Sequence, residues 1–549
     1  MSEWAHPAWP YLAAALLALV LPARARPALL AGPALAVGLA WSLPDGGTLT
    51  GRVMGVELAL ARADALSRMF AIVFALFGGL AGLYAGPGAG RRLHVAGFAA
   101  TAAGLVIVLA GDWITLYLGW EALAIASFAI VTDGGTPRAW QAAYRYLLVH
   151  FAGDALLLAG IAWHLATGGS GLVGALPADG ARLLFLVAFA INAAIPPVHA
   201  WLTDAYPESS PAGTVFLSAF ATKAAVYALA RAFPGWEPLV WAGVGMTLYG
   251  VVFAVLENDI RRLLGYHIVS QVGYMVAGVG LGTLLSLNGT AAHAFAHILY
   301  KGLLLMGAGA VVHATGRRKL SELGGLAGAM PAVLALYMVG ALSISGAPLL
   351  NGFVSKSLIV AAAEAEHRPV VYTLLVLASV GTFLSVGLKL PWLAFGGTGS
   401  GASVRAVPRA MLVAMTLTGA LCVLTGVAPS LLYVLLPFPL TYEPYTATHV
   451  LEALQGLTGI ALAFVLLRRQ LVGKPAVALD TDRLWRAGGA WVGGRLAPAI
   501  ARAAGALEAA ADVAVSRPVG PMPRATGRPV GYAVLLAVAA VGIALVAFR

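Results

Sequence analysis

The chain has 549 residues, of which 60% are hydrophobic and only 10% are charged, and its mean hydropathy is +0.87. Repeated apolar stretches of about 20 residues can cross a bilayer as helices, so this composition excludes a large soluble domain and predicts an all-α, polytopic integral membrane protein. The formal net charge of +11 does not indicate nucleic-acid binding, because the basic residues lie mostly in short loops between apolar runs, where they set orientation.

The first apolar run, from Trp9 to Leu21, has Glu3 and no basic residue before it, which favours a retained helix over a signal peptide. This run and those that follow predict about sixteen transmembrane crossings. The runs are 8–22, 27–43, 68–86, 93–111, 113–131, 141–166, 182–199, 212–233, 238–256, 262–284, 288–313, 326–366, 370–396, 407–436, 451–469 and 531–548. The polar segment 44–67 is expected to form a small external hairpin.

Basic residues gather in the loops after odd-numbered runs if the N-terminus lies outside, and the positive-inside rule then makes these loops cytoplasmic. They hold Arg24, Arg26, Arg91, Arg92, Arg138, Arg261, Arg262, Arg317, Arg318, Lys319, Arg405, Arg468, Arg469 and Lys474. The fit has two exceptions. The loop after the seventh run has no basic residue, and the external segment 44–67 carries Arg52 and Arg62.

The run 326–366 would be about twice as long as the bilayer core if it formed one continuous helix at 1.5 Å per residue, so we expect it to be broken. The stretch Ser345-Gly-Ala-Pro348 and Gly352 supply the break. An interrupted helix inside a bundle exposes backbone groups to an ion path. A tight turn between two short helices is the alternative.

The residue composition changes after Lys474, because residues 480–517 carry scattered charges among Ala, Leu, Val and Trp. This pattern favours a lateral, interfacial amphipathic helix before the final span 531–548. Gly488 and Gly489, followed by Gly493 and Gly494, weaken its first half, so a broken helix or a linker is the alternative.

Glu121, Lys223, Lys301 and Lys356 each lie inside a long apolar run, and Asp154 is a further carboxylate at membrane depth. Ionisable side chains there are costly and persist mainly where they pair, meet water or move ions. Lys223 and Glu121 have no opposite charge nearby in their own runs, so a pairing between Glu121 and a buried lysine would keep both charged. A fixed ion pair that only positions helices is the alternative role.

His293, His297 and Lys301 follow one another at i, i+4 spacing in the run 288–313, which places them along one helix face. Two imidazoles beside a buried amine could exchange protons near neutral pH. Packing histidines are one alternative. A zinc site is another, but no carboxylate or cysteine ligand is near in sequence, and a charged Lys301 would repel the metal.

The single cysteine, Cys422, lies in an apolar run. A chain with one cysteine cannot form an internal disulfide or, by itself, a cysteine-ligated cluster. We therefore expect no cofactor, no metal and no catalytic redox centre in the chain.

Several motifs occur in a fixed order along the chain. They are Pro196-Pro-Val-His-Ala-Trp-Leu-Thr-Asp-Ala-Tyr-Pro-Glu, Phe216-Leu-Ser-Ala-Phe-Ala-Thr-Lys-Ala-Ala-Val-Tyr, Glu257-Asn-Asp-Ile-Arg-Arg-Leu-Leu-Gly-Tyr, the His293 to Lys301 motif and Gly352-Phe-Val-Ser-Lys356. As a set they resemble the antiporter-like subunits shared by Mrp-type cation/proton antiporters and respiratory complex I, above all the D subunit of the Mrp type. The resemblance covers roughly residues 100–400.

The resemblance implies a role for each buried charge. Glu121 would be the buried glutamate of the family, Asp154 a neighbouring carboxylate and Lys223 the central lysine. Lys301 would be the relay lysine and Lys356 the terminal lysine on the broken helix. In the family these groups form a polar axis along the membrane midplane, and protons reach and leave it through half-channels.

The proton path expected from this likeness starts near Lys223, continues through His267 or water to His293, His297 and Lys301, and ends near Lys356. Lys389, near the end of the run 370–396, is also titratable. It lies close to the cytoplasmic boundary, so it could instead snorkel to the surface.

The chain departs from the family at two positions. Asn192 stands where most relatives have a lysine that pairs with the buried glutamate, so Glu121 would pair differently or be protonated at rest. Arg261 stands where many relatives have lysine, and arginine does not give up its proton in a protein. His267 could titrate in its place. Both changes leave open altered coupling or loss of ion transfer.

The expected organisation has five parts: N-terminal transmembrane helices in 1–111, an antiporter-like ion-translocating core in 112–400, C-terminal transmembrane helices in 401–474, a cytoplasmic lateral segment in 475–530 and a final helix in 531–549. The expected function is proton, or coupled proton and Na⁺, translocation beside other membrane subunits of a multisubunit complex in the cell (inner) membrane. A subunit of a redox-driven proton pump and a structural subunit with reduced ion transfer are the alternatives.

Overall fold

A computed structural model of the chain describes residues 5–53, 55–397 and 403–471. All of them belong to one compact unit, Met1–Ala478. A second unit, Leu479–Arg549, lies outside the described residues, as do the lateral segment expected in 475–530 and the final crossing expected in 531–549.

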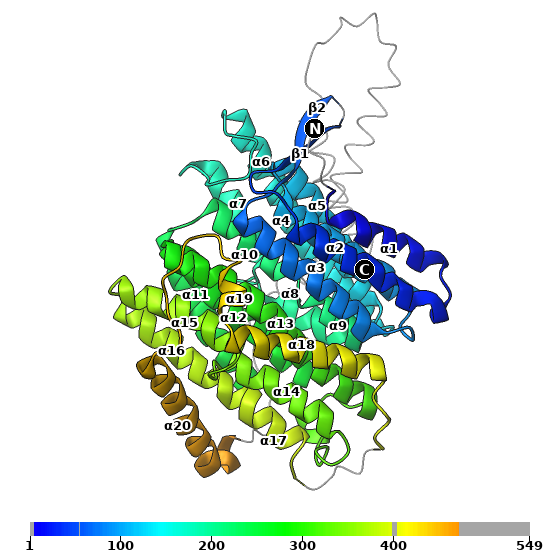
Figure 1. Cartoon of the computed structure of the whole chain (residues 1–549), viewed down its shortest axis with the longest axis vertical. Helices are drawn as coiled ribbons and strands as arrows, with labels where there is room; N and C mark the ends of the chain where they lie inside the picture. Colours follow the sequence, from blue (N-terminus) through cyan, green and yellow to red (C-terminus); the bar gives the residue numbers. More distant parts are fainter. Residues whose placement is uncertain (1–4, 54, 398–402, 472–549) are drawn as a thin grey trace, which may run out of the picture. The chain divides into compact units, whose positions relative to one another are not determined.

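The described part of the chain is mainly helical (Figure 1). The α-helices are α1 (Ala8–Val20), α2 (Ala31–Trp41), α3 (Ala65–Ala85), α4 (Arg91–Leu109), α5 (Trp113–Thr132), α6 (Pro137–Ala166), α7 (Gly180–Asn192), α8 (Ala200–Ala205), α9 (Pro211–Leu217), α10 (Ala221–Ala232), α11 (Glu237–Leu256), α12 (Ile260–Leu281), α13 (Leu284–Thr315), α14 (Pro331–Ile344), α15 (Asn351–Ala365), α16 (Pro369–Thr382), α17 (Leu390–Ala394), α18 (Arg409–Val427), α19 (Ser430–Tyr433) and α20 (Ala447–Leu471). Short 3₁₀ turns are η1 (Ala23–Leu30), η2 (Tyr206–Glu208) and η3 (Leu320–Glu322), and η4 (Phe383–Lys389) is π-helical.

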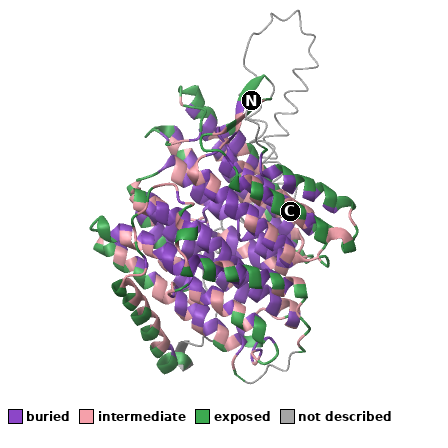
Figure 2. Cartoon of the chain, in the orientation of Figure 1, coloured by how far each residue is buried: buried purple, intermediate pink, exposed green. Residues whose placement is uncertain are grey.

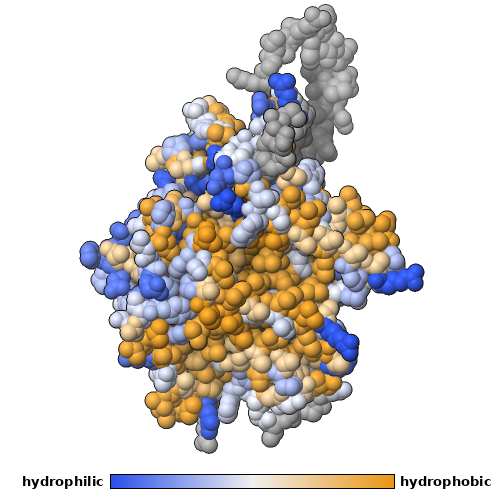
Figure 3. All heavy atoms as spheres, in the orientation of Figure 1, coloured by the Kyte–Doolittle hydropathy of each residue, from blue (hydrophilic) through white to orange (hydrophobic). Residues whose placement is uncertain are grey.

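Within the described residues, ten helical segments are long and apolar enough to cross a bilayer, and three shorter apolar helices accompany them. Apolar side chains cover much of the visible face of these helices (Figure 3), as expected where lipid replaces water. The all-α polytopic class is therefore confirmed. The count of about sixteen crossings is not confirmed.

Segment 44–67 forms the expected hairpin. Strand β1 (Thr48–Val53) pairs antiparallel with β2 (Val56–Arg62), with an irregularity between Leu49 and Thr50. The hairpin leads into α3 through Asp64, whose side chain accepts a hydrogen bond from the Ser67 backbone N–H and so caps the helix.

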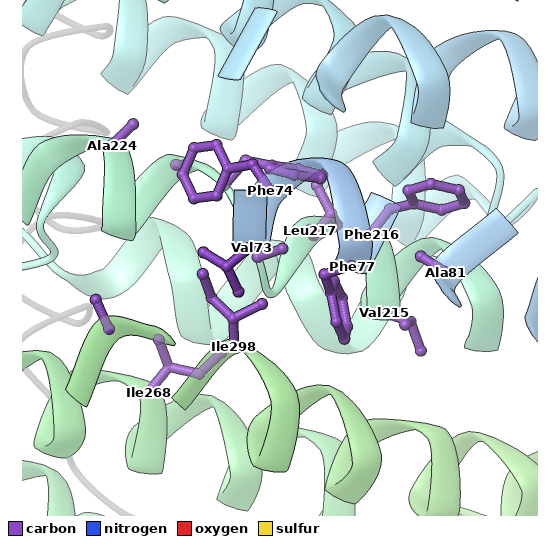
Figure 4. Packing of buried hydrophobic residues seen from close by; sticks show 14 of the residues in the cluster. Val73, Phe74, Phe77, Ala81, Val215, Phe216, Leu217, Ala224, Ile268 and Ile298 are labelled. Carbon is purple, nitrogen blue, oxygen red and sulfur yellow. The ribbon is translucent and has the colours of Figure 1, made fainter. Parts of the chain in front are cut away.

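Helix α13 lies at the centre of the bundle and packs against α3, α9, α12, α14, α15 and α18. Figure 2 shows buried residues concentrated among these helices, and Figure 4 shows part of their apolar packing, with Val73 of α3, Ile268 of α12 and Ile298 of α13. The approach of α13 to α3 is close, because a Cβ added at Gly302 would lie 2.1 Å from the Phe77 ring. The ionisable side chains of His293, His297 and Lys301 on α13 are therefore fully buried.

The run 326–366 is broken, as expected, between α14 and α15. Gly346 and Leu349 in the connection have φ of 76° and 70°, a left-handed conformation that stops a helix. Gly352 opens α15 against the last turn of α14, because a Cβ there would lie 1.8 Å from the Ser343 carbonyl oxygen. Of the two glycines that predicted the break, Gly346 adopts the left-handed conformation and Gly352 allows the close approach.

A second break was not expected from sequence. The run 212–233 is divided into α9 and α10 by a turn at Ser218–Phe220, and the run 182–199 ends early, because α7 stops at Asn192 before Pro196 and Pro197. No glycine or proline marks the turn at 218–220.

A third irregularity, the π-helical η4 between α16 and α17, changes the direction in which Ser385 and Lys389 project.

Candidate ion-translocation site

Lys223 lies in the first turn of α10, directly after the break that separates α10 from α9. Its side chain is fully buried, and its Nζ donates to the Ser218 carbonyl oxygen at 2.6 Å and to Thr222 Oγ1 at 3.1 Å. Ser218 caps the C-terminus of α9, so its carbonyl is one that a continuous helix would have used internally. The break therefore supplies a backbone acceptor for a buried amine.

Lys356 repeats this arrangement after the break between α14 and α15. Its Nζ donates to the carbonyl oxygen of Ile344, the last residue of α14, at 2.8 Å, and to Ser379 Oγ at 3.0 Å. The amine also lies 5.0 Å from the centre of the Tyr274 ring, over its face. Both lysines are thus held by polar groups that can accept from an ammonium without neutralising it.

Lys301 and His297 lie between these two lysines on α13 and are fully buried. In the part of the chain that the structure describes, neither the Lys301 amine nor either ring nitrogen of His297 has a hydrogen-bond partner. Lys301 therefore differs from Lys223 and Lys356, whose amines each donate two hydrogen bonds.

His293 connects α13 to the surrounding helices. Its Nδ1 is 3.2 Å from Ser355 Oγ of α15, and its Nε2 is 3.3 Å from the Tyr300 hydroxyl. The Tyr300 hydroxyl is in turn 3.2 Å from Gln271 Oε1 of α12, to which it donates. Ser355 directly precedes Lys356, so His293 contacts the residue next to the terminal lysine.

His267 of α12 joins the same region from another side, since its Nε2 lies 2.7 Å from Ser385 Oγ in η4. It is within electrostatic range of Lys301 and Lys356. His297 is within electrostatic range of Lys223, Lys301 and Lys356. Charges at short range in a low-dielectric interior influence one another strongly, so protonation of one of these groups alters the cost of protonating the next.

Glu121 of α5 does not have the lysine partner that the sequence suggested. Its Oε1 accepts a hydrogen bond from the Tyr117 hydroxyl at 2.6 Å, one turn earlier on the same helix, and the side chain is half-buried. Asp154 of α6 is fully buried and within electrostatic range of Glu121, and neither of its oxygens has a hydrogen-bond partner among the described residues. Glu121 therefore has a second carboxylate, Asp154, as its charged neighbour, whereas the sequence suggested a lysine.

Lys389 is buried rather than snorkelling. Its Nζ donates to the carbonyl oxygens of Val255 at 2.6 Å and Glu257 at 2.9 Å, at the C-terminal end of α11. A cation there satisfies carbonyls that α11 leaves without an internal partner. This geometry fits a helix-capping role.

Arg261 and Asn192, the two residues that were expected to depart from the family, both make local contacts. Arg261 donates to the carbonyl oxygens of Ser209 at 2.6 Å and Ser210 at 3.0 Å and to Thr214 Oγ1, so it holds the start of α9 in place. Asn192 Nδ2 reaches only the Ala188 carbonyl of its own helix, at 3.5 Å. Arg261 therefore fixes the backbone before α9 through hydrogen bonds from a permanently charged side chain.

No group of three or more His, Cys, Asp or Glu side chains suited to a metal occurs among residues 5–53, 55–397 and 403–471. The hydroxyl and amide groups that link the histidines, on Tyr300, Gln271, Ser355 and Ser385, were not expected from sequence. They are uncharged residues in apolar helices, and only Tyr300, beside Lys301, and Ser355, beside Lys356, had positions that pointed to the site.

Comparison with known proteins identifies the fold and the family. The profile of the family described as "NADH:quinone oxidoreductase/Mrp antiporter, TM" matches residues 110–385. The N subunit of NADH-quinone oxidoreductase from Desulforudis audaxviator is 34% identical over 331 residues, which cover 55% of this chain and 65% of that protein. The D subunit of the Na⁺/H⁺ antiporter from Alkalihalophilus pseudofirmus is 31% identical over 309 residues, covering 53% and 62%. The chain thus spans slightly less than two thirds of each of these relatives.

Two solved structures share the fold. A chain of the Mrp complex from Dietzia sp. matches with a TM-score of 0.69 at 23% identity, covering 85% of this chain and 98% of that chain. A chain of respiratory complex I from Thermus thermophilus with bound NADH matches with a TM-score of 0.69 at 25% identity, covering 85% and 99%. Because the family profile matches half of its length, the chain belongs to the transmembrane family of NADH:quinone oxidoreductase and Mrp antiporter subunits, as an antiporter-like membrane protein.

Proposed function

We propose that the chain is the proton-translocating subunit of a multisubunit Na⁺/H⁺ antiporter complex in the cell (inner) membrane, with residues 112–400 as its ion-translocating core. The observation that carries the proposal is the buried series that runs from Lys223 through the α13 residues His297, Lys301 and His293 to Lys356. A helix that only supported the bundle would not need three ionisable side chains at bilayer depth.

Lys223 receives the proton in this proposal. Its ammonium is held by the Ser218 carbonyl and the Thr222 hydroxyl, which stabilise the charge without pairing it permanently. The proton can then pass to His297 or Lys301 when a change in the neighbouring charge lowers the cost of protonating them. A fixed ion pair would instead have trapped it.

His293 carries the proton onward, since each of its ring nitrogens faces a hydroxyl group that can both donate and accept. Lys356 receives it beside the α14–α15 break. The charge on Lys356 then opposes a second proton on His293 or His267, and this repulsion separates successive transfers.

The second candidate is a proton-pumping subunit of a redox-driven complex, with electron transfer done by other subunits. The similarity to an NADH-quinone oxidoreductase subunit, at 34% identity, supports it about as well as the similarity to an antiporter subunit at 31% supports the first. The proton path would be the same in both.

Purification from native membranes in a mild detergent, with mass spectrometry of every co-purifying chain, separates the candidates. Small hydrophobic partners without redox proteins, together with Na⁺-dependent proton movement in vesicles that contain the complex, would support the antiporter. Iron–sulfur, flavin or hydrogenase-like partners would overturn it in favour of the redox-driven pump.

A further inference from the structure

A cavity of about 150 Å³ lies at the end of the bundle where η1 joins α1 to α2. Four segments meet in its wall: η1 with Arg26, the last turn of α3 with Leu83, α4 with Phe98 and the first turn of α18 with Ala410. Apart from Arg26 and His94, the side chains that line it are apolar. The cavity therefore combines an apolar interior with a cationic group.

Arg26 uses only part of its guanidinium within the protein. Its Nη1 donates to the carbonyl oxygens of Pro87 at 3.2 Å and Ala89 at 2.5 Å, in the connection between α3 and α4. Its Nε is buried and has no hydrogen-bond partner among the described residues. Buried N–H groups are normally paired, so this donor indicates a place for an acceptor that the described residues do not supply.

The rim of the cavity carries a positive charge that acidic residues do not balance. Residues 23–30, 86–92 and 403–410, which form η1, the α3–α4 connection and the start of α18, contain no Asp or Glu. They hold the six arginines Arg24, Arg26, Arg91, Arg92, Arg405 and Arg409, and none of these forms an ion pair with a carboxylate in the described residues. Asp133 approaches the rim, since its Oδ1 would lie 3.6 Å from a Cβ added at Gly90, but one carboxylate does not balance six guanidiniums.

Two helices begin at this rim, and both begin with arginine. Helix α4 starts with Arg91 and Arg92, and α18 starts with Arg409. Neither first turn has an acidic residue, and neither N-cap supplies a side-chain hydrogen bond. The α3–α4 connection touches the start of α18, because a Cβ added at Gly86 would lie 3.1 Å from the Ala410 Cβ. A helix start favours an anion and disfavours a cation, so an external anion would relieve the repulsion at both starts.

Basic residues elsewhere on the same side of the protein have acidic partners. Arg262 lies 3.3 Å from Glu257, and Arg318 lies 2.7 Å from Asp259. The positive-inside rule places these arginines and those of the rim on the cytoplasmic side. The rule accounts for the arginines at the rim but not for their lack of partners.

An apolar surface borders η1. Leu16, Leu17 and Val20, in the last turns of α1, are exposed. Figure 3 shows apolar side chains over α1 and hydrophilic ones at the tip of the bundle beside it, where Figure 1 shows the connection between α1 and α2. Acyl chains thus have an apolar surface next to the cationic rim.

We propose that this cavity binds an anionic phospholipid of the cytoplasmic leaflet. Arg26 holds the phosphate, Arg91, Arg92 and Arg409 surround it with positive charge, and the apolar wall takes the glycerol end of an acyl chain. The cytoplasmic leaflet carries anionic lipids, and basic pockets between membrane helices on that side suit their headgroups. The inference concerns the lipid environment of the chain and holds whichever complex the chain belongs to.

Lipid binding is measured on the complex, purified in a mild detergent and washed until weakly bound lipid is removed. Phosphatidylglycerol is titrated in, and bound lipid is counted by native mass spectrometry. Phosphatidylcholine with the same acyl chains has no net charge and is the reference. We expect phosphatidylglycerol to bind about tenfold more tightly or better, because the arginines favour the net negative headgroup.

Two charge variants test the rim. Arg91→Gln with Arg409→Gln removes two exposed charges and should weaken phosphatidylglycerol binding about tenfold or more. Lys319→Gln with Arg468→Gln removes the same charge from exposed cytoplasmic positions outside the cavity wall and should leave the affinity unchanged.

A filling variant tests the cavity itself. Ala410→Phe narrows the cavity without changing the charge and should weaken binding about tenfold, whereas Ala406→Phe, an exposed position outside the wall, should not. Thermal midpoints without added lipid show whether each variant is folded. The exposed rim variants decide the question if Ala410→Phe does not assemble.

Equal weakening by the two charge variants would mean diffuse attraction of lipid to the cytoplasmic face and would overturn the site. Parental affinity in a folded Ala410→Phe variant would also overturn it, because the lipid would then lie elsewhere. Displacement of phosphatidylglycerol by inorganic phosphate would show a site for free anions and would overturn the assignment to lipid. None of these results depends on ion transport, so failure of the proposed function is distinguishable.

Discussion

Lys223 and Lys356 occupy corresponding places after two interruptions of the helical bundle, because the amine of each donates to a carbonyl oxygen at the end of the preceding helical segment, at 2.6 Å and 2.8 Å. The two breaks differ in sequence, since one contains Gly346 and Pro348 and the other contains neither residue type. In both breaks, a carbonyl oxygen that has no partner within its own helix accepts a hydrogen bond from a buried lysine. An interrupted helix therefore solves the desolvation problem of a mobile charge without a fixed counter-ion.

Replacement of Lys356 by methionine should abolish its proton exchange while keeping an unbranched side chain only one atom shorter. We expect transport by the intact complex to fall by about a hundredfold, the scale on which a group that transfers protons contributes. Ser379→Ala removes only one of the amine's two acceptors and should reduce transport by about threefold to tenfold. Ion-driven pH changes in everted vesicles measure both. Equal losses in the two variants would contradict a transfer role for the amine.

Ser385 holds His267 through one hydrogen bond, and its loss leaves a buried imidazole nitrogen without that partner. Ser385→Ala should therefore lower the free energy of unfolding by about 1–3 kcal/mol. Ser385→Thr retains a hydroxyl and should restore most of the loss. Thermal unfolding in detergent compares the two, and an alanine variant as stable as the threonine variant would show that the contact contributes little.

Gly302 allows α13 to approach Phe77 of α3, so a methyl group at this position should separate the two helices. Gly302→Ala should destabilise the protein by about 1–3 kcal/mol, and the same change should cost less in a Phe77→Ala background, where the ring that the methyl group would meet is absent. Gly245→Ala on α11, where a Cβ would meet nothing within 4 Å, is the control. If Gly302→Ala cost as much in the Phe77→Ala background as in the parent protein, the contact with the ring would not be the cause.

The ion pair between Asp64 and Arg231 gives a prediction for pH dependence. Burial raises the pKa of Asp64, but the hydrogen bond and charge of Arg231 and the Ser67 cap outweigh it, and the pKa lies below its ordinary value. A carboxyl whose pKa is lower in the folded state stabilises the fold above its unfolded pKa, and this contribution is lost as the pH falls through the lower, folded value.

Asp64→Asn should therefore lower the thermal midpoint at neutral pH, and the difference from the parent protein should shrink once the pH falls below about 4, the unfolded value. Unfolding midpoints of both proteins across pH 3–8 measure this. A difference that stays constant down to the acid limit would mean that the loss at neutral pH reflects the helix cap alone.

Sequence was sufficient for the parts of the fold whose signals are local. The hairpin in 44–67 and the break in 326–366 are confirmed, because polar composition and Gly346, Pro348 and Gly352 specify them directly. The break at Ser218–Phe220 contains neither glycine nor proline, so residue types alone did not indicate it.

The candidate site shows the same division. Charged residues in apolar runs are conspicuous, and the structure brings Lys223, His293, His297, Lys301 and Lys356 into one series. Their uncharged neighbours are not conspicuous, because serine, tyrosine and glutamine also occur in ordinary helix packing. The interaction of Glu121 with Tyr117, in place of a lysine, also required coordinates.

Transport by the intact complex carrying Lys223→Ala or Lys301→Ala tests the central claim most directly. Lys319→Ala, at an exposed lysine that pairs with Glu322, is the matched control. The account predicts that each buried-lysine variant assembles at the parental level but loses most of its ion-coupled proton movement in vesicles, whereas the control retains it. Unchanged transport in both buried-lysine variants would contradict it, and the chain would then be a structural subunit of its complex.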